Sequence, residues 1–238
     1  MNTLNTFLFV VFPYVAGIVF VVGVTYRYRR TAFTVSSLSS QFLEGDKLFW
    51  GSVPLLAVFF GHLLAFLLPQ ATLAWNSVPV RLIILEVSAF VFGLSLLFGL
   101  LSLLWRRLTN PRVRVVTSRM DIAIELLLLA QVVLGCWVAL GFRWGSSWFA
   151  ADLTPYLWSL LALSPETDAV FALPLVIRLH IAGAFLILFM VPFTRLAHFV
   201  VAPLHYLFRP YQVVIWNWDR KAVRNPKEPW SKARPKNN

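Results

Sequence analysis

LPLVIRLHIAGAFLILFMVPFTRLAH, from Leu173 to His198, is a long apolar run that carries two histidines, His180 and His198. An α-helix turns once every 3.6 residues, so an offset of 18 residues predicts five whole turns and places both imidazoles on one side. The histidines would then stand roughly 27 Å apart, close to the ~30 Å hydrocarbon thickness of a bilayer. Ionisable side chains inside a membrane are usually functional, and imidazole is a common metal ligand. The stretch therefore indicates two haems, one near each membrane face.

The composition of the whole chain is that of an integral membrane protein. Apolar residues make up 59% of the 238 positions and charged residues only 13%, too few for an ordinary soluble surface. The net charge of +11 is explained by topology, because the basic residues lie at the ends of apolar segments and no nucleic-acid motif is present. No nucleic-acid partner is expected. The single cysteine, Cys136, excludes an internal disulfide and a Cys-rich zinc or iron–sulfur site in this chain.

Five apolar segments predict an all-α membrane protein with five transmembrane helices in a bundle. The segments cover about residues 7–24, 48–68, 82–105, 122–141 and 173–198. Lys and Arg gather in the loops after the first and third segments and in the tail, whereas the opposite loops hold only Arg81 and Arg143. By the positive-inside rule, the N-terminus lies outside and the C-terminus in the cytoplasm. The expected domains are a membrane domain, 1–208, and a basic cytoplasmic tail, 209–238, which is either a membrane-hugging extension or a docking arm.

With this orientation, His62 and His180 lie at matching depths toward the outer leaflet. His62 falls late in the second segment, which runs outward, and His180 falls early in the fifth, which runs inward. Two neutral imidazoles on facing helices form the axial ligand set of a low-spin b-type haem. Gly61 and Gly183 would let a flat macrocycle approach the helix backbones. The alternative is a pair of histidines bonded to neighbouring hydroxyls or carbonyls, but three of only four histidines lie within the spans, which favours ligation.

His198 is the expected ligand of a second haem nearer the cytoplasm, and the residues offer it no obvious partner. The stretch that should face it, near the start of the second segment, reads FWGSVPL and contains no histidine. His205 is a further candidate, although it follows a proline and is expected outside the hydrocarbon. Arg178 and Arg195 lie shortly before the two histidines of the fifth segment, and each is a candidate for pairing with a haem propionate or with lipid phosphate.

A series of short motifs runs in order through nearly the whole chain: FPYVAGIVF, SSQ at 39–41, FFGH, RRLTNPRVR, the stretch 121–131, IRLH and PFTRLAHFVVAP. In this order they resemble the membrane cytochrome b (gamma) subunit of respiratory nitrate reductase. The resemblance implies five spans in the cytoplasmic (inner) membrane of a prokaryote and two b haems. It also implies a quinol-oxidising electron-transfer subunit, which passes electrons to an iron–sulfur beta subunit and a molybdenum alpha subunit. Nitrate reduction itself would take place on a partner, because this chain has no cluster-binding cysteine set.

By this resemblance, His62 and His180 match the outer-haem ligands, and His198 matches one inner-haem ligand. The family's other inner ligand is a histidine about ten residues before the match of His62, and here that position is Ser52, or Trp50 if the gap is placed differently. Three states of the inner site are therefore open: no haem, a five-coordinate haem, or a haem completed by another group. Some inner carrier is expected, because a bare gap of roughly 27 Å is too long for fast electron tunnelling.

Charged and polar groups near the spans are candidates for quinol and proton chemistry. Arg81 takes the position of a basic residue, typically Lys, that the family uses in quinol binding; the alternative is an interfacial arginine reaching lipid phosphate. Glu86 and Glu125 could relay protons or pair with arginine, and a structural role is favoured for Glu125. Gln131 and Cys136 are expected to be packing groups.

Two other classes of protein fit the same pattern. One is a related quinone-linked cytochrome b of a sulfite-reductase-linked or heterodisulfide-reductase-like complex, which shares the fold. The other is a non-haem membrane anchor or transporter whose histidines bind no iron. A sharp b-type α band in a reduced-minus-oxidised spectrum would separate the haem proteins from the anchor or transporter.

Overall fold

The computed structural model describes residues 3–30 and 46–197, and every regular element in this part of the chain is a helix. The long helices are α2 (Phe12–Arg30), α4 (Asp46–Leu67), α6 (Pro79–Thr109), α8 (Arg119–Gly141) and α12 (Leu175–Met190). The short elements are α1 (Thr3–Thr6), the π-helix η1 (Phe7–Val11), α5 (Pro69–Asn76), α7 (Pro111–Val116), α9 (Gly145–Trp148), the π-helix η2 (Phe149–Leu153), α10 (Thr154–Leu161), α11 (Asp168–Ala172) and the 3-10 turn η3 (Val191–Phe193).

Some predicted features lie outside the described residues. These are His198, His205, the linker over 31–45 and the tail predicted over 209–238, together with the side chains of Trp50 and Ser52. The predicted domain boundary therefore stays a prediction.

Four helical segments are each long and apolar enough to cross a membrane: Thr3–Arg30, Pro79–Thr109, Arg119–Gly141 and Leu175–Phe193. A fifth is reached when Val53–Leu67 and Pro69–Asn76, which are bent by 104° relative to each other, are taken together. The bend falls at Leu68, whose backbone leaves the helical region (φ −127°, ψ 57°). A residue before proline is driven out of the α conformation by the proline ring, so Pro69 ends α4. The prediction of an all-α membrane protein is confirmed, with four or five spans.

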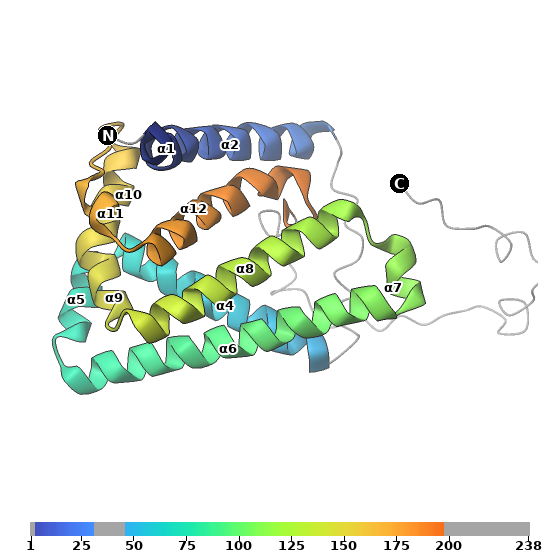
Figure 1. Ribbon diagram of the computed structural model, residues 1–238, viewed down its shortest axis with the longest axis horizontal. Helices are drawn as coiled ribbons and strands as arrows, with labels where there is room; N and C mark the ends of the chain where they lie inside the picture. The colour runs from blue at the N-terminus through green and yellow to red at the C-terminus, as the bar shows by residue number, and fades with distance from the viewer. Residues whose placement is uncertain (1–2, 31–45, 198–238) are drawn as a thin grey trace, which may run out of the picture. The chain divides into compact units, whose positions relative to one another are not determined.

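The long helices pack in a series of pairs, with α4 as the first member of the series and α2 as the last. Helix α4 packs on α6, α6 on α8, α8 on α12, and α12 on α2. Figure 1 shows α2, α12, α8 and α6 from top to bottom, with the short helices α5, α9, α10 and α11 gathered at one end, which we call the cap end. Many large apolar side chains on the long helices stay exposed, among them Phe98 (67%), Trp105 (70%) and Leu140 (69%). A surface of this kind is suited to lipid rather than water.

The best-buried cluster lies where the cap end meets the long helices. It joins Phe9 of η1, Tyr156 of α10, Val170 of α11 and Ile181 of α12, each at most 5% exposed. The hydroxyl of Tyr156 donates to the carbonyl of Phe9 over 2.8 Å. Burial, together with the neighbouring Tyr14, raises the pKa of the Tyr156 phenol. The short helices are therefore fixed to the bundle by apolar packing and by a buried hydrogen bond.

The fifth span is interrupted before it reaches residue 198. Helix α12 ends at Met190, the turn η3 follows, and Thr194 is extended (φ −119°, ψ 173°). Proline has no N–H to donate and its ring collides with the preceding turn, so Pro192 accounts for the break. The prediction of one helix from 173 to 198 is wrong, so the argument that counted five helical turns from His180 to residue 198 no longer applies.

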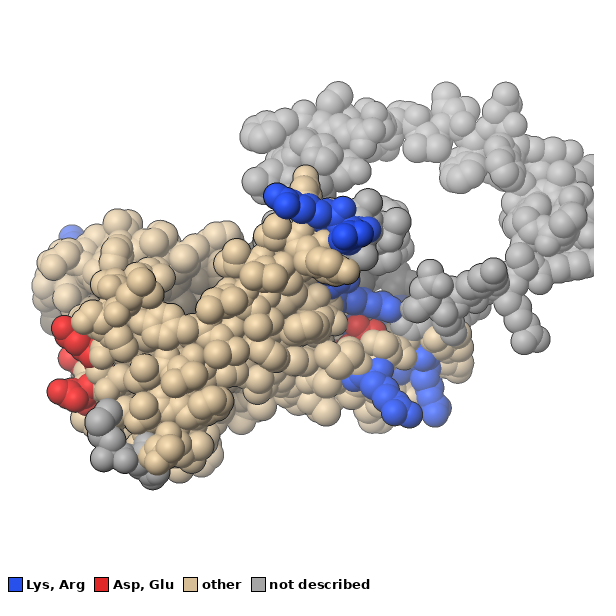
Figure 2. Space-filling view, turned by 90° about the horizontal axis from the view of Figure 1, so that it is seen from above, with Lys and Arg blue, Asp and Glu red and all other residues tan. Residues whose placement is uncertain are grey.

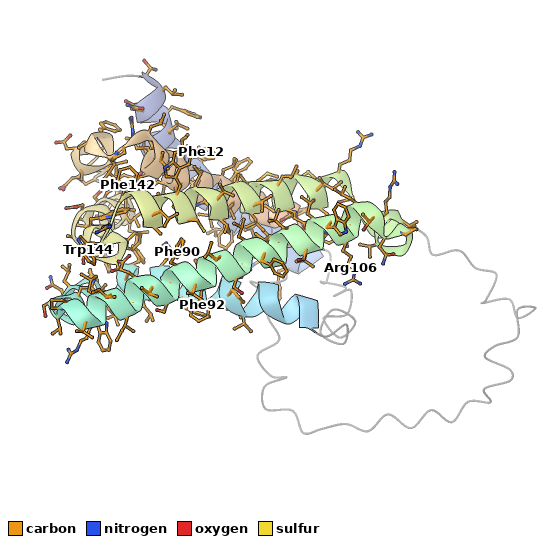
Figure 3. All side chains as sticks on the ribbon, turned by 60° about the horizontal axis from the view of Figure 1, so that its bottom comes forward. Phe12, Phe90, Phe92, Arg106, Phe142 and Trp144 are labelled. Carbon is orange, nitrogen blue, oxygen red and sulfur yellow. The ribbon has the colours of Figure 1, made fainter. Side chains whose placement is uncertain are left out.

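Charge is unevenly distributed between the two ends of the bundle. Figure 2 shows most Lys and Arg side chains at the end opposite the cap end, while Asp and Glu side chains lie mainly at the cap end. Figure 3 places Arg106 near the far end of α6 and Trp144 at the cap end. The described basic residues of the far end include Arg27, Arg29 and Arg30 in the last turn of α2. The folded chain therefore keeps the asymmetry that the loops have in the sequence.

Candidate functional site

His62 lies on α4, and one nitrogen of its ring, Nδ1, makes a hydrogen bond within the helix. Its Nδ1 is 2.8 Å from the carbonyl oxygen of Val58, one turn earlier. A carbonyl can only accept, so Nδ1 carries the proton and Nε2 keeps a free lone pair. The ring also meets Phe149 of η2 edge to face, with 5.6 Å between the ring centroids. A histidine oriented through Nδ1 in this way presents Nε2 as a metal ligand.

His180 lies on α12 against α8. Its Nδ1 is buried and has no hydrogen-bond partner among the described residues. A Cβ atom at Gly135 of α8 would stand 3.1 Å from Cε1 of the imidazole, so glycine at this position lets the ring approach the α8 backbone. One turn earlier, Gln131 donates from Nε2 to the carbonyl oxygen of His180 over 2.8 Å. Helix α8 therefore holds both the ring and the backbone of His180.

The two predicted outer ligands lie on separate helices, His62 on α4 and His180 on α12. His62 and His180 are close enough to interact electrostatically. They come from α4 and α12, which are not among the closely packed helix pairs of the described residues. Beside His62, a Cβ at Gly61 would meet open space. His62 has an exposed ring with its Nδ1 bonded, and His180 has a buried Nδ1 that lacks a partner, so both remain candidates for holding a group.

A hollow of about 450 Å³ lies in the bundle, and neither His62 nor His180 is among the residues that line it. Its lining is almost entirely apolar and comes from α2, α4, α10 and α12. Phe66, one turn after His62, and Phe185, five residues after His180, both lie in its wall. Within the described part of the chain no group of three or more His, Cys, Asp or Glu side chains could hold a bare metal ion. The candidate site is therefore the pair of imidazoles itself, and the apolar hollow is not part of it.

Gly183 has a different environment from the one predicted. A Cβ there would collide with Oε1 of Gln131, so the side chain of Gln131 covers this glycine. Gln131, expected only to pack, is therefore a specific hydrogen-bonding partner of α12. Gly135, Gln131 and Phe149 were missed by reasoning from the sequence. Gln131 and Gly135 are one helical turn apart, which indicates that they share a face of α8. Nothing in the sequence indicates that this face meets His180.

Arg81 begins α6 at the cap end, where α5 turns into α6. Its guanidinium carbon lies 5.3 Å from the centre of the Trp75 ring, and Nε1 of Trp75 donates to the carbonyl oxygen of Arg81 over 3.3 Å. The arginine is exposed. A cation held over an aromatic face keeps its charge and its remaining N–H donors available. Arg81 therefore lies in the first turn of α6 at the cap end, and no contact joins it to His62 or His180 among the described residues.

Glu86 ties α6 to the cap end. Its Oε1 accepts from the backbone N–H of Ser146 (2.8 Å) and from the Ser146 hydroxyl (2.6 Å). Asn76, at the end of α5, donates from Nδ2 to the hydroxyl oxygens of Ser146 and Ser147, each over 3.0 Å. Helices α5, α6 and α9 are joined through these polar groups.

Glu125 and Asp121 form ion pairs at the end of the bundle opposite the cap end. Nε of Arg107 lies 2.7 Å from Glu125, and Nε of Arg195 lies 3.3 Å from Asp121. The structural role favoured for Glu125 is confirmed. Arg195, a candidate for a haem propionate or lipid phosphate, pairs instead with a carboxylate of α8. Arg178 keeps a buried Nε without a hydrogen-bond partner among the described residues.

Comparison with known proteins covers most of the chain. Residues 5–217 match the family described as nitrate reductase gamma subunit. The respiratory nitrate reductase 2 gamma chain of Escherichia coli (strain K12) is 32% identical over 218 residues, which covers 89% of this chain and 96% of the relative. The respiratory nitrate reductase 1 gamma chain of the same strain is 31% identical, with coverages of 90% and 98%. The nitrate reductase gamma chain of Bacillus subtilis (strain 168) is 30% identical, with coverages of 85% and 94%.

Proposed function

This chain belongs to the nitrate reductase gamma subunit family, and from that membership we propose that it is a membrane cytochrome b that takes electrons from quinol and delivers them to an iron–sulfur subunit. The relatives are gamma chains of nitrate reductases, and they are matched over nearly their whole length. The proposed partners are an iron–sulfur beta subunit and a molybdenum alpha subunit. The chain itself would be the electron-transfer subunit of the oxidoreductase.

The open ring nitrogens of His62 and His180 are the observation that supports this proposal most directly. Nε2 of His62 is free to bind iron because Nδ1 donates to Val58, and the buried Nδ1 of His180 has no partner among the described residues. A b haem held between these imidazoles supplies a one-electron carrier between the quinol and the partner subunit. On α8, Gly135 leaves room for the ring of His180, and Gln131 donates a hydrogen bond to the backbone carbonyl of His180.

Oxidation of the quinol releases two electrons and two protons, and the proposal places it at the cap end. Arg81, held over Trp75, is proposed to donate a hydrogen bond to a quinone or quinol oxygen. Its guanidinium stays charged, so it cannot take up a proton. Glu86 is the proposed proton acceptor, because its carboxylate lies at the same end of α6 and accepts hydrogen bonds from Ser146.

The charge distribution supports an orientation for this chemistry. By the positive-inside rule, the end of the bundle that carries most of the described Lys and Arg is proposed to face the cytoplasm of a prokaryote, with the N-terminus and the cap end outside and the C-terminus inside. Protons would leave the quinol on the outside while electrons move inward. Moving one charge across the membrane is worth about 2.3 kcal/mol per 100 mV, so the reaction would contribute to the membrane potential.

His198 is the proposed ligand of an inner haem, on the strength of the family resemblance. The opposite ligand position holds Ser52 or Trp50 in place of histidine, so the inner group is held through His198 and another donor or through His198 alone. An inner carrier is required because the electrons must reach the cytoplasmic side.

The experiment that tests the proposed function is a reduced-minus-oxidised spectrum of the purified complex together with its haem content per chain. A b-type α band is expected. Replacing His62 or His180 by Ala should remove the outer haem, while His205→Ala serves as the matched histidine control and should leave it intact. A chain with no b-type band would contradict the proposal, and so would an unchanged band intensity and haem content in both the His62→Ala and the His180→Ala variants.

A further inference from the structure

The glycine at position 135 of α8 makes room for the imidazole of His180. A Cβ at Gly135 would stand 3.1 Å from Cε1, 3.7 Å from Nε2 and 3.8 Å from Nδ1 of the ring. The edge of the ring that carries both nitrogens therefore faces the backbone of α8. Carbon atoms pack at about 3.5–4.0 Å, so a side chain at position 135 would have to displace either the ring or the helix that bears it.

The backbone of His180 is not free to move away, because Gln131 holds it. Nε2 of Gln131, one turn of α8 before Gly135, donates to the carbonyl oxygen of His180 over 2.8 Å. The same side chain lies against Gly183, where a Cβ would collide with its Oε1. In membrane proteins, small residues and interhelical hydrogen bonds fix how closely two helices approach. The two residues of α8 therefore act on different parts of His180, Gln131 on its backbone and Gly135 on its ring.

The imidazole of His62 takes its direction from other elements. Its Nδ1 donates to the carbonyl oxygen of Val58 within α4, and its ring meets Phe149 of η2 edge to face. Among the described residues, no hydrogen bond or ring contact joins His62 to α8. A change at Gly135 should therefore turn one imidazole and leave the other in place.

We infer that Gly135 is a positioning residue that sets the plane of the His180 imidazole, and with it the angle between the two axial ligand planes of the outer haem; this inference rests on the proposed function. Ligand orientation is one of the means by which a protein tunes a bound metal. While Gln131 holds the backbone, a methyl group at position 135 is accommodated by rotation of the imidazole about its Cβ–Cγ bond. Without that hydrogen bond, α12 can move away from α8 and the ring keeps its plane.

The test is the EPR spectrum of the oxidised complex, because the g values of a low-spin ferric haem with two histidine ligands depend on the angle between the imidazole planes. The outer signal is the one that His62→Ala removes. We expect Gly135→Ala to shift the largest g value of the outer signal while haem content per chain stays at the wild-type level. Gly141→Ala is the matched control on α8 and should give the wild-type spectrum, since a Cβ there meets only Trp137 of the same helix, at 3.6 Å or more.

A second variant keeps the test decisive if Gly135→Ala loses the outer haem instead of shifting its signal. Gln131→Met removes the hydrogen bond but keeps a side chain of similar size. The double variant Gln131→Met/Gly135→Ala should therefore regain the haem, or bring the signal back toward that of Gln131→Met alone, so the two effects are non-additive.

Two results would overturn the inference and leave the proposed function intact. One is an outer signal unchanged in Gly135→Ala, and the other is a double variant in which the effect of Gly135→Ala is undiminished. A wild-type complex with no outer low-spin signal would instead remove the proposed function, and this inference with it.

Discussion

The hydrogen bond between Gln131 and the carbonyl of His180 shows how a single polar side chain can set the register of two membrane helices. Gln131 needs the missing side chain at Gly183 to reach that carbonyl, because a Cβ there would collide with its Oε1. Helix α12 therefore cannot slide or rotate against α8 without losing both the hydrogen bond and the fit. At the residue scale, this pair is the most specific contact between the two helices.

Replacing Gly183 by Ala is expected to destabilise the protein by about 1–3 kcal/mol, because the hydrogen bond of Gln131 is lost and its buried oxygen is displaced. Thermal unfolding in detergent measures the effect. Gly17→Ala is the matched control, since a Cβ at Gly17 meets nothing within 4 Å and the change relieves a helix of a glycine. Equal stability of the two variants would contradict this account.

Tyr156→Phe tests the buried phenol at the cap end. Loss of its hydrogen bond to Phe9 is expected to cost about 1 kcal/mol near neutral pH. Because burial raises the pKa of Tyr156, the folded state favours the neutral phenol, so its stabilising contribution is fully present below pH ~10 and declines above it. The difference in melting temperature between wild type and variant should therefore shrink as the pH rises from 9 toward 11. A difference that grew over this range would refute the assignment.

The contrast between Pro54 and Pro192 marks the limit of what could be predicted about elements. Pro54 lies inside α4 and the helix continues through it, whereas Pro192 ends α12. The sequence signal is the same in both places. The outcome at Pro192 depends on groups far away in the sequence, Gly23 and Arg27 of α2, which make room for the ring and bond the carbonyls of the turn. A single-helix prediction over 173–198 could not include them.

The ion pair between Arg107 and Glu125 joins the end of α6 to the first turns of α8. Glu125→Gln is expected to cost about 2–3 kcal/mol, below the value for a fully buried pair because 28% of the Arg107 side chain is exposed. Chemical or thermal unfolding in detergent gives the measurement. Glu166→Gln, at an exposed position, is the control and should change stability by less than about 0.5 kcal/mol. Similar losses in both variants would argue against a specific pair.

At the scale of the molecule, the helical class and most spans could be predicted because a membrane requires long apolar helices with satisfied backbones. Chain direction and charge asymmetry predict matching depths for His62 and His180, and their ligation of a haem stays a prediction. The arrangement of the cap end was not predictable in this way. Its arrangement depends on polar contacts such as Glu86 with Ser146 and Asn76 with Ser147, which join segments about sixty to seventy residues apart.

The orientation of the bundle gives a prediction that needs no haem. In a Cys136→Ala background, Tyr28→Cys and Leu163→Cys place thiols at exposed positions at opposite ends, where the native residues are 66% and 78% exposed. A membrane-impermeant maleimide added to spheroplasts, in which the cytoplasmic membrane is intact, should label the substituted position 163 and spare position 28. Inside-out vesicles should give the reverse. Labelling of position 28 from the outside would invert the proposed topology.

The π-helix η2 has a consequence for how this chain can vary. A π turn holds one residue more than an α turn, and it is Phe149, the first residue of η2, that touches the imidazole of His62. Deleting one residue between Phe149 and Thr154 would let the segment relax into ordinary α-helix and rotate everything before it by about 100°. A different side chain would then face His62. An insertion or deletion in this short segment would therefore change which side chain faces His62, so its length is itself part of the site.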